Sequence, residues 1–511
     1  MLFNSYAFIL GFLPVALALF FLLGRLNRVW AAAWLALASI AFYGYWSPKY
    51  IALLLGSVAF NFLAGRAIAK RAGSTGGRRL LAASVAANLI LLSFYKYADF
   101  FAASANEIAK THLALLHIAL PIGISFFTFT QIAFLADASK GIVKEYRFVH
   151  YLLFVSYFPH LIAGPILHHA EMMPQFASEA PYRFSARSFG IGLTVFAIGL
   201  AKKVLIADPF GDMVSPIFAA AHAGVPIRLV AAWVGVLAFT CQLYFDFSGY
   251  SDMAIGISKL FGIDLPVNFA SPYKSTSVIQ FWKRWHMTLS RFLRDYLYFP
   301  LGGNRKGKFR RYVNLMTTMV LGGLWHGANY TFLIWGGLHG CYLMANHAWR
   351  SVFPQRRHPS FARTLVSGTV TFLAVAAAWV FFRADDIPSA LNLLRGLGGF
   401  NGIAVHEGTS SAFWRGFAHF LPPVTLAPEG AFQHLQFSSS RVELALRFLS
   451  AAVLLLAMPN TQQIVERVER ACASRESSRF YRYAVPGLAG VLLVSALSQM
   501  QKVSAFLYFR F

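Results

Sequence analysis

Two histidines, each directly after a tryptophan, are the residues of this sequence best suited to chemistry. His326 lies in the apolar run 321–330, and His286 lies earlier, in the segment 281–296. An imidazole surrounded by hydrocarbon must find a partner or a wet cavity, and histidine is the side chain whose charge changes near neutral pH. The two histidines therefore make one candidate site.

The sequence around His326 predicts a bend inside the membrane. The apolar segment 312–324 is too short to cross a bilayer comfortably, and the glycines at 322, 323 and 327 allow the backbone to bend or to approach a ligand closely. Irregular backbone at membrane depth is tolerated only where protein or a water-filled cavity surrounds it. We therefore expect 312–324 and 329–348 to form a hairpin with His326 at its bend, beside a cavity.

The segment 281–296 combines basic and aromatic residues. Arg284, Arg291 and Asp295 recur at helical spacing, which predicts an amphipathic helix. A solvated basic face is the usual reason for such a cluster. A phosphate-bearing cosubstrate is the alternative, because arginine forks match phosphate oxygens and these arginines lie next to His286. The sequence leaves both alternatives open.

The stretch 241–265 carries polar groups that lipid would reject. A carboxylate at the bilayer centre costs at least about 2.5 kcal/mol, so Asp246 and Asp252 require an interior or watery face. Either Asp246 pairs with an arginine, Arg284 or Arg383, and fastens helices, or it forms a wall of a reaction chamber. The glycines at 249 and 256 favour close contact between helices.

Other histidines carry weaker signals. The segment 158–165 holds two prolines, a glycine and His160, which predicts a broken or re-entrant helix. His168 and His169 are adjacent, point apart on a helix and lack companions at ligand spacing, so no metal site is expected. His339 is expected to pack or to lie at an interface.

The composition indicates a polytopic membrane protein. Of 511 residues, 57% are hydrophobic and only 13% are charged, and apolar runs recur from end to end. The net charge of +25 comes from short loops between apolar segments rather than from a basic domain. These loops are expected to meet anionic lipid head groups, although some basic residues could bind an anionic cosubstrate. The three cysteines lie far apart and suggest neither a metal site nor a disulfide framework.

Apolar length and loop charge predict the topology. Arg25 and Arg28 follow the first apolar segment, and the basic loop 70–79 follows the third, so the N-terminus is expected outside. The basic segment 274–311 should be cytoplasmic, and both the charge-poor loop 384–441 and the C-terminus should lie outside. The first segment shows no cleavage site and is expected to remain as a helix. At about 20 residues per crossing, the predicted spans lie near 6–24, 29–45, 50–66, 80–98, 113–136, 150–167, 188–207, 228–248, 312–324, 329–348, 364–382, 442–458 and 484–500.

These motifs together resemble the membrane-bound O-acyltransferase (MBOAT) family, in its alginate O-acetyltransferase branch. The resemblance runs over nearly the whole length and depends on the order of many short motifs. They are Leu2–Ser5, Phe42–Trp46, Pro121–Phe126, Phe158–Pro165, Lys202–Lys203, Phe245–Asp252, Phe281–Phe299, Gly302–Arg305, Trp325–Ala328, Phe381–Ala384 and Phe506–Phe511.

The resemblance implies an all-α fold and an activity. The fold would be one transmembrane domain over 1–511, with short or re-entrant helices around a central tunnel. His326 matches the family's invariant histidine, and His286 matches its second active-site position. The family implies acetyl-CoA as a cytoplasmic donor, no permanently bound cofactor, and a periplasmic acetyltransferase partner that attaches the acetyl group to a secreted polysaccharide. His160 departs from the glutamine of many relatives.

Acyl transfer from a thioester needs an activated hydroxyl and a stabilised oxyanion. We expect His326 to be the general base, His286 to orient it or share its proton, and Asn329 or glycine amides to meet the oxyanion. A covalent acetyl group on His326 or a nearby serine is an alternative. Side chains expected to bind the donor or substrate are Lys283, Arg284, Arg291, Arg294, Trp325, Asn329, Asp246 and Asp252.

Other functions stay open at this point. A transporter or flippase without chemistry of its own would also need carboxylates and imidazoles within the membrane. No repeat of fixed period supports a repeat-built transporter. Within the resembled family, D-alanyl transfer to teichoic acid, or acylation of a lipid or protein, is an alternative. The sequence does not specify the glycan, which could be alginate, cellulose or another exopolysaccharide of a bacterial inner-membrane pathway.

Overall fold

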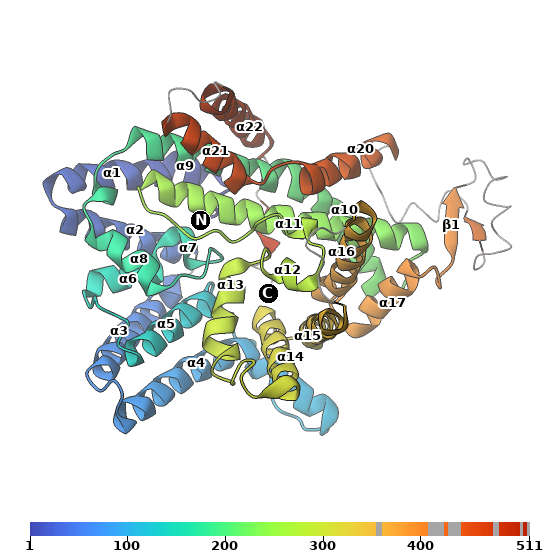
Figure 1. The fold of residues 1–511 in the computed structure, drawn as a ribbon, viewed down its shortest axis with the longest axis horizontal. Helices are drawn as coiled ribbons and strands as arrows, with labels where there is room; N and C mark the ends of the chain where they lie inside the picture. Colours follow the sequence, from blue (N-terminus) through green and yellow to red (C-terminus); the bar gives the residue numbers. More distant parts are fainter. Residues whose placement is uncertain are drawn as a thin grey trace.

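The protein is a bundle of helices (Figure 1). The computed structural model describes residues 1–511 except 47, 354–359, 407–423, 428–440, 474–479, 501–503 and 508–511. The all-α prediction is confirmed in this part of the chain, apart from two short strands, β1 (Ile403–His406) and β2 (Val424–Ala427), which pair in parallel. Most of the predicted outer loop 384–441 lies outside the described residues.

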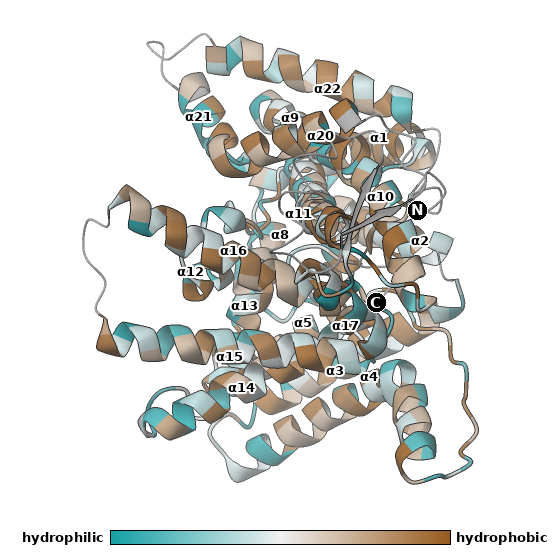
Figure 2. Cartoon of the chain, turned by 90° about the vertical axis from the view of Figure 1, so that its right-hand side faces the viewer, coloured by the Kyte–Doolittle hydropathy of each residue, from teal (hydrophilic) through white to brown (hydrophobic). Residues whose placement is uncertain are grey.

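Many helices are long and apolar enough to cross a membrane. Within the described residues there are 8 such spans, or 9 if a pair bent by 58°, Val442–Ala457 (α20 and η7) with Thr461–Ala471 (within α21), counts as one. Figure 2 shows hydrophobic residues along these helices, α16 and α22 among them. The chain is therefore a multi-pass membrane protein. The eight spans are η1–α1 (Ala7–Leu26), α2 (Arg28–Trp46), η2–α3 (Pro48–Ala69), α4 (Thr75–Ile108), α9–η4–α10 (Ala186–His222), α11 (Leu229–Leu260), α16 (Phe361–Arg383) and η8–α22 (Phe480–Gln499).

Two predicted spans are not continuous helices. The prediction of a span at 113–136 is wrong in its first half, because residues 109–121 are not helical and α5 covers only Ile124–Ser139. Gly123, with φ +73°, precedes α5 in the left-handed region that suits glycine. The predicted break near Pro159 is confirmed, because the chain divides there into α6 (Phe148–Ser156) and α7 (Phe158–Leu161).

The helix α11 runs through the middle of the bundle (Figure 1) and is the most buried of the candidate spans. It packs against α9 (Ala186–Ala201) through glycines on both helices. A Cβ at Gly249 would come within 2.8 Å of the Gly199 carbonyl oxygen, and one at Gly256 would overlap the backbone of Gly192. The predicted close contact at the glycines of α11 is thus confirmed, and it places the polar residues of α11 inside protein.

The predicted hairpin is present. The helices α14 (Gly307–His326) and α15 (Tyr330–Val352) pack closely side by side, and His326 is the last residue before the turn. α14 has 20 residues and begins earlier than predicted, so the prediction of a short segment at 312–324 is wrong. A Cβ at Gly323 would overlap the Phe332 carbonyl oxygen, which explains how the two backbones approach so closely.

The segment 281–296 is not one helix, contrary to the prediction. It divides into α12 (Val278–Trp282), α13 (Met287–Leu293) and the π-helical turn η6 (Arg294–Tyr298). The break falls at His286, whose φ of +41° lies in the left-handed region. Asn268 stabilises the break, because its backbone oxygen accepts a hydrogen bond from the Met287 N–H at 3.0 Å. The remaining described helices include α8 (His169–Ala177) and α17 (Ile387–Leu397).

Candidate active site

His326 lies at the end of α14 and is enclosed by aromatic rings. His326 is only 4% exposed to solvent. The ring centroids of Trp335 on α15 and Phe382 on α16 each lie 5.1 Å from that of His326, in edge-on contact. The hairpin and α16 therefore fix one side of the imidazole.

His286 faces His326 from the break between α12 and α13. The two imidazole centroids are 6.5 Å apart, and His286 is fully buried. Phe247 of α11 stands perpendicular to the His286 ring at 4.8 Å. The two histidines that the sequence singles out thus lie together in the structure, at the start of α13 and at the end of α14.

The hydrogen bonds of Asn268 define the tautomer of His286. The Asn268 Oδ1 accepts from the backbone N–H of Thr288 at 3.3 Å, from the Thr288 hydroxyl at 3.0 Å, and lies 3.0 Å from His286 Nδ1. A backbone N–H can only donate, so this atom of Asn268 is the acceptor, and His286 Nδ1 must carry the hydrogen. In the neutral imidazole the lone pair then resides on Nε2, which leaves this atom able to accept a proton.

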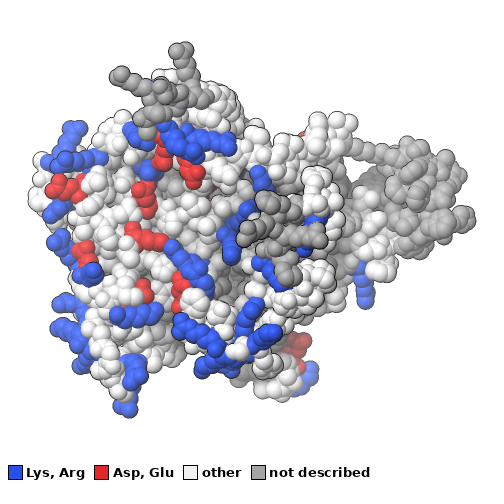
Figure 3. Space-filling view, viewed as in Figure 1, with Lys and Arg blue, Asp and Glu red and all other residues white. Residues whose placement is uncertain are grey.

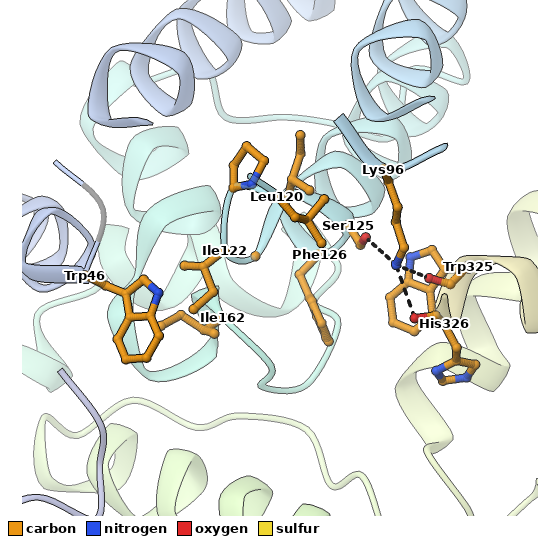
Figure 4. A pocket seen from close by; sticks show the side chains of 12 residues that line it. Trp46, Lys96, Leu120, Ile122, Ser125, Phe126, Ile162, Trp325 and His326 are labelled. Carbon is orange, nitrogen blue, oxygen red and sulfur yellow. Dashed lines mark hydrogen bonds between the residues drawn. The ribbon is translucent and has the colours of Figure 1, made fainter. Parts of the chain in front are cut away.

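A cavity of about 140 Å³ reaches His326 (Figure 4). Lys96 of α4 and Ser125 of α5 line it beside Trp325 and His326, and the exposed Trp46 lines its other end. The cavity predicted beside His326 is therefore present. Lys96 was missed by the sequence reasoning, although a lysine inside the apolar segment 80–98 was a usable signal.

A second cavity, of about 360 Å³, lies at the turn of the hairpin. Its lining includes Gly327, Asn329, Arg383 and Leu507. The side-chain amide of Asn329 donates to the Asp385 carbonyl oxygen at 2.8 Å, and its Oδ1 accepts from the Thr331 N–H at 3.0 Å. Both ends of Asn329 are thus used to hold the turn, and its predicted contact with an oxyanion stays a prediction.

A third and larger cavity, of about 770 Å³, carries the basic residues. Figure 3 shows lysine and arginine side chains gathered on the face of the molecule that includes the start of α14. Three of the four predicted basic residues line this cavity, and Arg311 and His347 join them. The three are Lys283, Arg291 and Arg294.

The basic cavity is only partly neutralised. Arg291 Nη2 lies 2.8 Å from Glu171 Oε2, and Arg294 Nε lies 2.7 Å from Asp295 Oδ1. Within the described residues, Lys283 and Arg311 make no ion pair with a carboxylate. The cavity therefore retains positive charge that suits an anionic ligand.

Arg284 does not line the basic cavity. It lies near Lys274 instead, where burial and the neighbouring guanidinium both lower the pKa of the lysine. Lys283 and Arg284 both lie in the turn after α12, but only Lys283 lines the basic cavity.

The carboxylates of α11 form ion pairs and line none of the three cavities described above. Asp246 Oδ1 lies 2.6 Å from Lys203 Nζ, and Asp252 Oδ2 lies 2.6 Å from Lys202 Nζ. The predicted pairing of Asp246 with Arg284 or Arg383 is wrong. Asp246 Oδ2 also accepts the Leu507 N–H at 3.0 Å, so it holds the C-terminal segment.

Other polar groups are held within the protein. His169 Nδ1 lies 3.2 Å from Asp137 Oδ2, and His168 Nδ1 lies 3.1 Å from the Tyr296 hydroxyl. The Trp282 indole N–H donates to His339 Nδ1 at 3.2 Å. In the part of the chain that the structure describes, no group of three potential ligands could hold a metal ion.

An enclosed imidazole pair beside a cationic cavity, inside a membrane bundle, is typical of an enzyme that works at membrane depth on an anionic cosubstrate. Residues 16–382 match the model of the membrane-bound O-acyltransferase family. The chain belongs to this family, and it is an O-acyltransferase.

Several relatives of the chain have names that state an activity. The chain is 43% identical to a peptidoglycan O-acetyltransferase of Helicobacter pylori, over 79% of this chain and 81% of the relative. It is 41% identical to a probable alginate O-acetylase of Pseudomonas putida, over 77% and 79%. A teichoic acid D-alanyltransferase of Lacticaseibacillus rhamnosus is 27% identical, over 63% and 82%. The predicted resemblance to the alginate branch is confirmed.

Proposed function

We propose that the protein transfers an acetyl group from acetyl-CoA to a hydroxyl group on a route to an envelope polysaccharide. The observation that carries the proposal is a chain of hydrogen bonds that joins the lining of the basic cavity to His286. Thr288 lines the basic cavity and also hydrogen-bonds to Asn268, which holds His286. A donor bound by its phosphates in that cavity would have its thioester near the imidazoles.

The basic cavity supports an anionic donor. The phosphates of acetyl-CoA would meet Lys283, Arg311 and the arginines of α13 and η6, whose guanidinium groups suit phosphate oxygens. The apolar part of the wall, with Trp282 and Met319, would face the uncharged arm of the donor.

The reaction proceeds as a direct transfer in this proposal. His326 takes the proton of the acceptor hydroxyl while the oxygen of that hydroxyl attacks the thioester carbonyl carbon. The carbon–sulfur bond breaks, an ester carbon–oxygen bond forms, and the proton passes to the leaving thiolate to give free CoA. His286, whose Nε2 carries the lone pair, accepts a hydrogen bond from the reacting group or shares the proton. General base catalysis of this kind contributes about 10²–10⁴-fold.

The topology in this proposal follows from the charges. Basic segments face the cytoplasm, so the donor enters from that side, and both termini lie outside a bacterial inner membrane. On the outer side, a periplasmic acetyltransferase then passes the acetyl group from this ester to a hydroxyl group of the polysaccharide. The named activities of the relatives, on peptidoglycan and alginate, support a glycan of the cell envelope as the final acceptor.

The competing functions have less support. Membership of an acyltransferase family argues against a transporter without chemistry of its own. The D-alanyltransferase relative shares less identity and a smaller part of this chain than the two acetyl-transferring relatives.

The test uses purified full-length protein in proteoliposomes supplied with acetyl-CoA and a hydroxyl acceptor. We expect release of free CoA by the wild type and at least a hundredfold slower release by His326→Ala, with unchanged membrane insertion. The exposed His222→Ala serves as control, because its side chain lies in none of the three cavities. No release by the wild type would refute the donor, and full activity of His326→Ala would refute its role. Ester-linked acetate measured separately in peptidoglycan and in exopolysaccharide would identify the glycan.

A further inference from the structure

Lys96 is an ionisable side chain in an unusual place. It belongs to α4, a candidate membrane span, and it is only partly exposed. Its side chain points into the cavity that reaches His326 (Figure 4). A cationic side chain inside a membrane bundle is costly unless specific groups receive it, so its position calls for a functional explanation.

The ammonium group of Lys96 donates hydrogen bonds to three acceptors. Its Nζ donates to the carbonyl oxygen of Trp325 at 2.6 Å, to that of His326 at 3.3 Å, and to the Ser125 hydroxyl at 3.3 Å (Figure 4). An ammonium has three donors, and all three find acceptors. Two of these acceptors are the last two carbonyls of α14.

The neighbouring Tyr97 extends the same contact. Its hydroxyl donates to the Leu324 carbonyl oxygen at 2.8 Å, so three successive carbonyls at the end of α14 receive hydrogen bonds from α4. The last carbonyls of a helix have no donor within the helix, and the helix dipole concentrates negative charge there. A cation therefore holds this end more strongly than a neutral donor would.

We infer that Lys96 is a positioning residue of the transfer reaction. It seats the final turn of α14, so that the imidazole of His326 faces His286. Lys96 also lies 5.9 Å from the centre of the Trp325 ring, which ties the residue before His326 to the same charge. This inference rests on the proposed function of His326. Misplacing a catalytic group by about 1 Å can cost about a hundredfold in rate.

The experiment replaces Lys96 by methionine, which keeps an unbranched side chain and removes the charge. We expect faster hydrogen exchange of the amides in 321–330, a kcat about ten to a hundredfold lower, and an unchanged KM for acetyl-CoA. Lys96→Arg should restore part of the kcat, because arginine can still donate to the carbonyls. Lys49→Met, at an exposed lysine, is the matched control and should leave the hydrogen exchange, kcat and KM unchanged.

The inference would be overturned by hydrogen exchange that is unchanged in Lys96→Met, or by exchange that increases while kcat stays at the wild-type value. A rise in KM alone would also overturn it, because Lys96 would then act in donor binding. If the wild type released no CoA, the donor proposal would fail, and the exchange measurement alone would decide whether Lys96 holds α14.

Discussion

At the scale of single residues, the site depends on side chains that hold the two histidines. Asn268 receives three hydrogen-bond donors on one oxygen and thereby determines which nitrogen of His286 carries the hydrogen. Lys96 plays the corresponding part for the backbone that carries His326. Neither residue belongs to a motif with an obvious chemical role, and both act on a histidine through a contact from another part of the chain.

Asn268→Ala should lower kcat by roughly tenfold or more, because His286 would lose the acceptor that fixes its tautomer. The variant should also lose about 1–3 kcal/mol of stability, because the Thr288 donors would be left buried without an acceptor. Asn268→Asp keeps an oxygen in place and should retain more activity than the alanine variant. Steady-state CoA release and thermal unfolding in detergent measure both effects. Equal activity of the two variants would contradict the assigned tautomer.

At the scale of elements, the hairpin of α14 and α15 is the part that brings His326 to its place. Glycines on the facing sides allow the backbones to touch. A Cβ at Gly336 would overlap the Met319 carbonyl oxygen, whereas a Cβ at the adjacent Gly337 would meet nothing within 4 Å. The spacing of the two helices, and with it the position of His326, therefore depends on Gly336.

Gly336→Ala should destabilise the protein by about 1–3 kcal/mol or more, because the added methyl group forces the two helices apart. Gly337→Ala is the matched control and should leave stability and activity close to wild type. Thermal unfolding of the purified variants, together with the yield of folded protein, provides the comparison. Similar behaviour of both variants would show that the hairpin tolerates a wider separation than the structure has.

Two neighbouring basic residues in the turn after α12 differ in their surroundings. Lys283 lines the basic cavity, whereas Arg284 lies outside it. If the cavity binds the donor phosphates, Lys283→Gln should raise the KM for acetyl-CoA about tenfold, because a hydrogen bond to a charged group contributes about 1.5–3 kcal/mol. Arg284→Gln should leave KM near wild type. Titration with acetyl-CoA at two salt concentrations tests this, and an equal effect of both substitutions would assign the basic residues to a solvated face.

At the scale of the whole molecule, ion pairs in the interior join distant parts of the chain. Lys203 bridges Asp246 of α11 and Asp208 of α10 (Asp208–His222), and its Nζ also donates to the Ala505 carbonyl oxygen at 3.3 Å. Because Asp246 binds the Leu507 N–H, the same pair holds the C-terminal segment next to the cavity at the hairpin turn. Lys203 and Asp246 thus join the middle of the chain to its C-terminal segment.

Lys203→Met should destabilise the protein by about 3–5 kcal/mol, because it leaves the buried Asp246 without its cation. Combining Lys203→Met with Asp246→Leu should recover part of the lost stability, since the fully buried charge is then removed and only the partly exposed Asp208 lacks its cation. The melting temperatures of the two variants and the wild type make the comparison. A double variant that is less stable than Lys203→Met would contradict this account.

Local sequence was enough to predict the membrane bundle, the hairpin bend at His326, the break near Pro159 and the close contact at Gly249 and Gly256. Each of these follows from apolar length, or from proline and glycine, whose effects on the backbone act over a few residues. The resemblance to acyltransferases likewise came from short motifs in order. The pairing of His286 with His326 was predicted from their chemistry.

Only the tertiary structure decided which groups meet. The helical spacing of 281–296 predicted one helix, but Asn268, Thr288 and Met287 form hydrogen bonds that stabilise a break there. The partner of Asp246 is Lys203 rather than an arginine. The role of Lys96 is evident only from its tertiary contact with the end of α14. A buried charge or hydrogen-bonding group is satisfied by whatever the fold brings within about 3 Å, and this depends on contacts between residues far apart in the sequence.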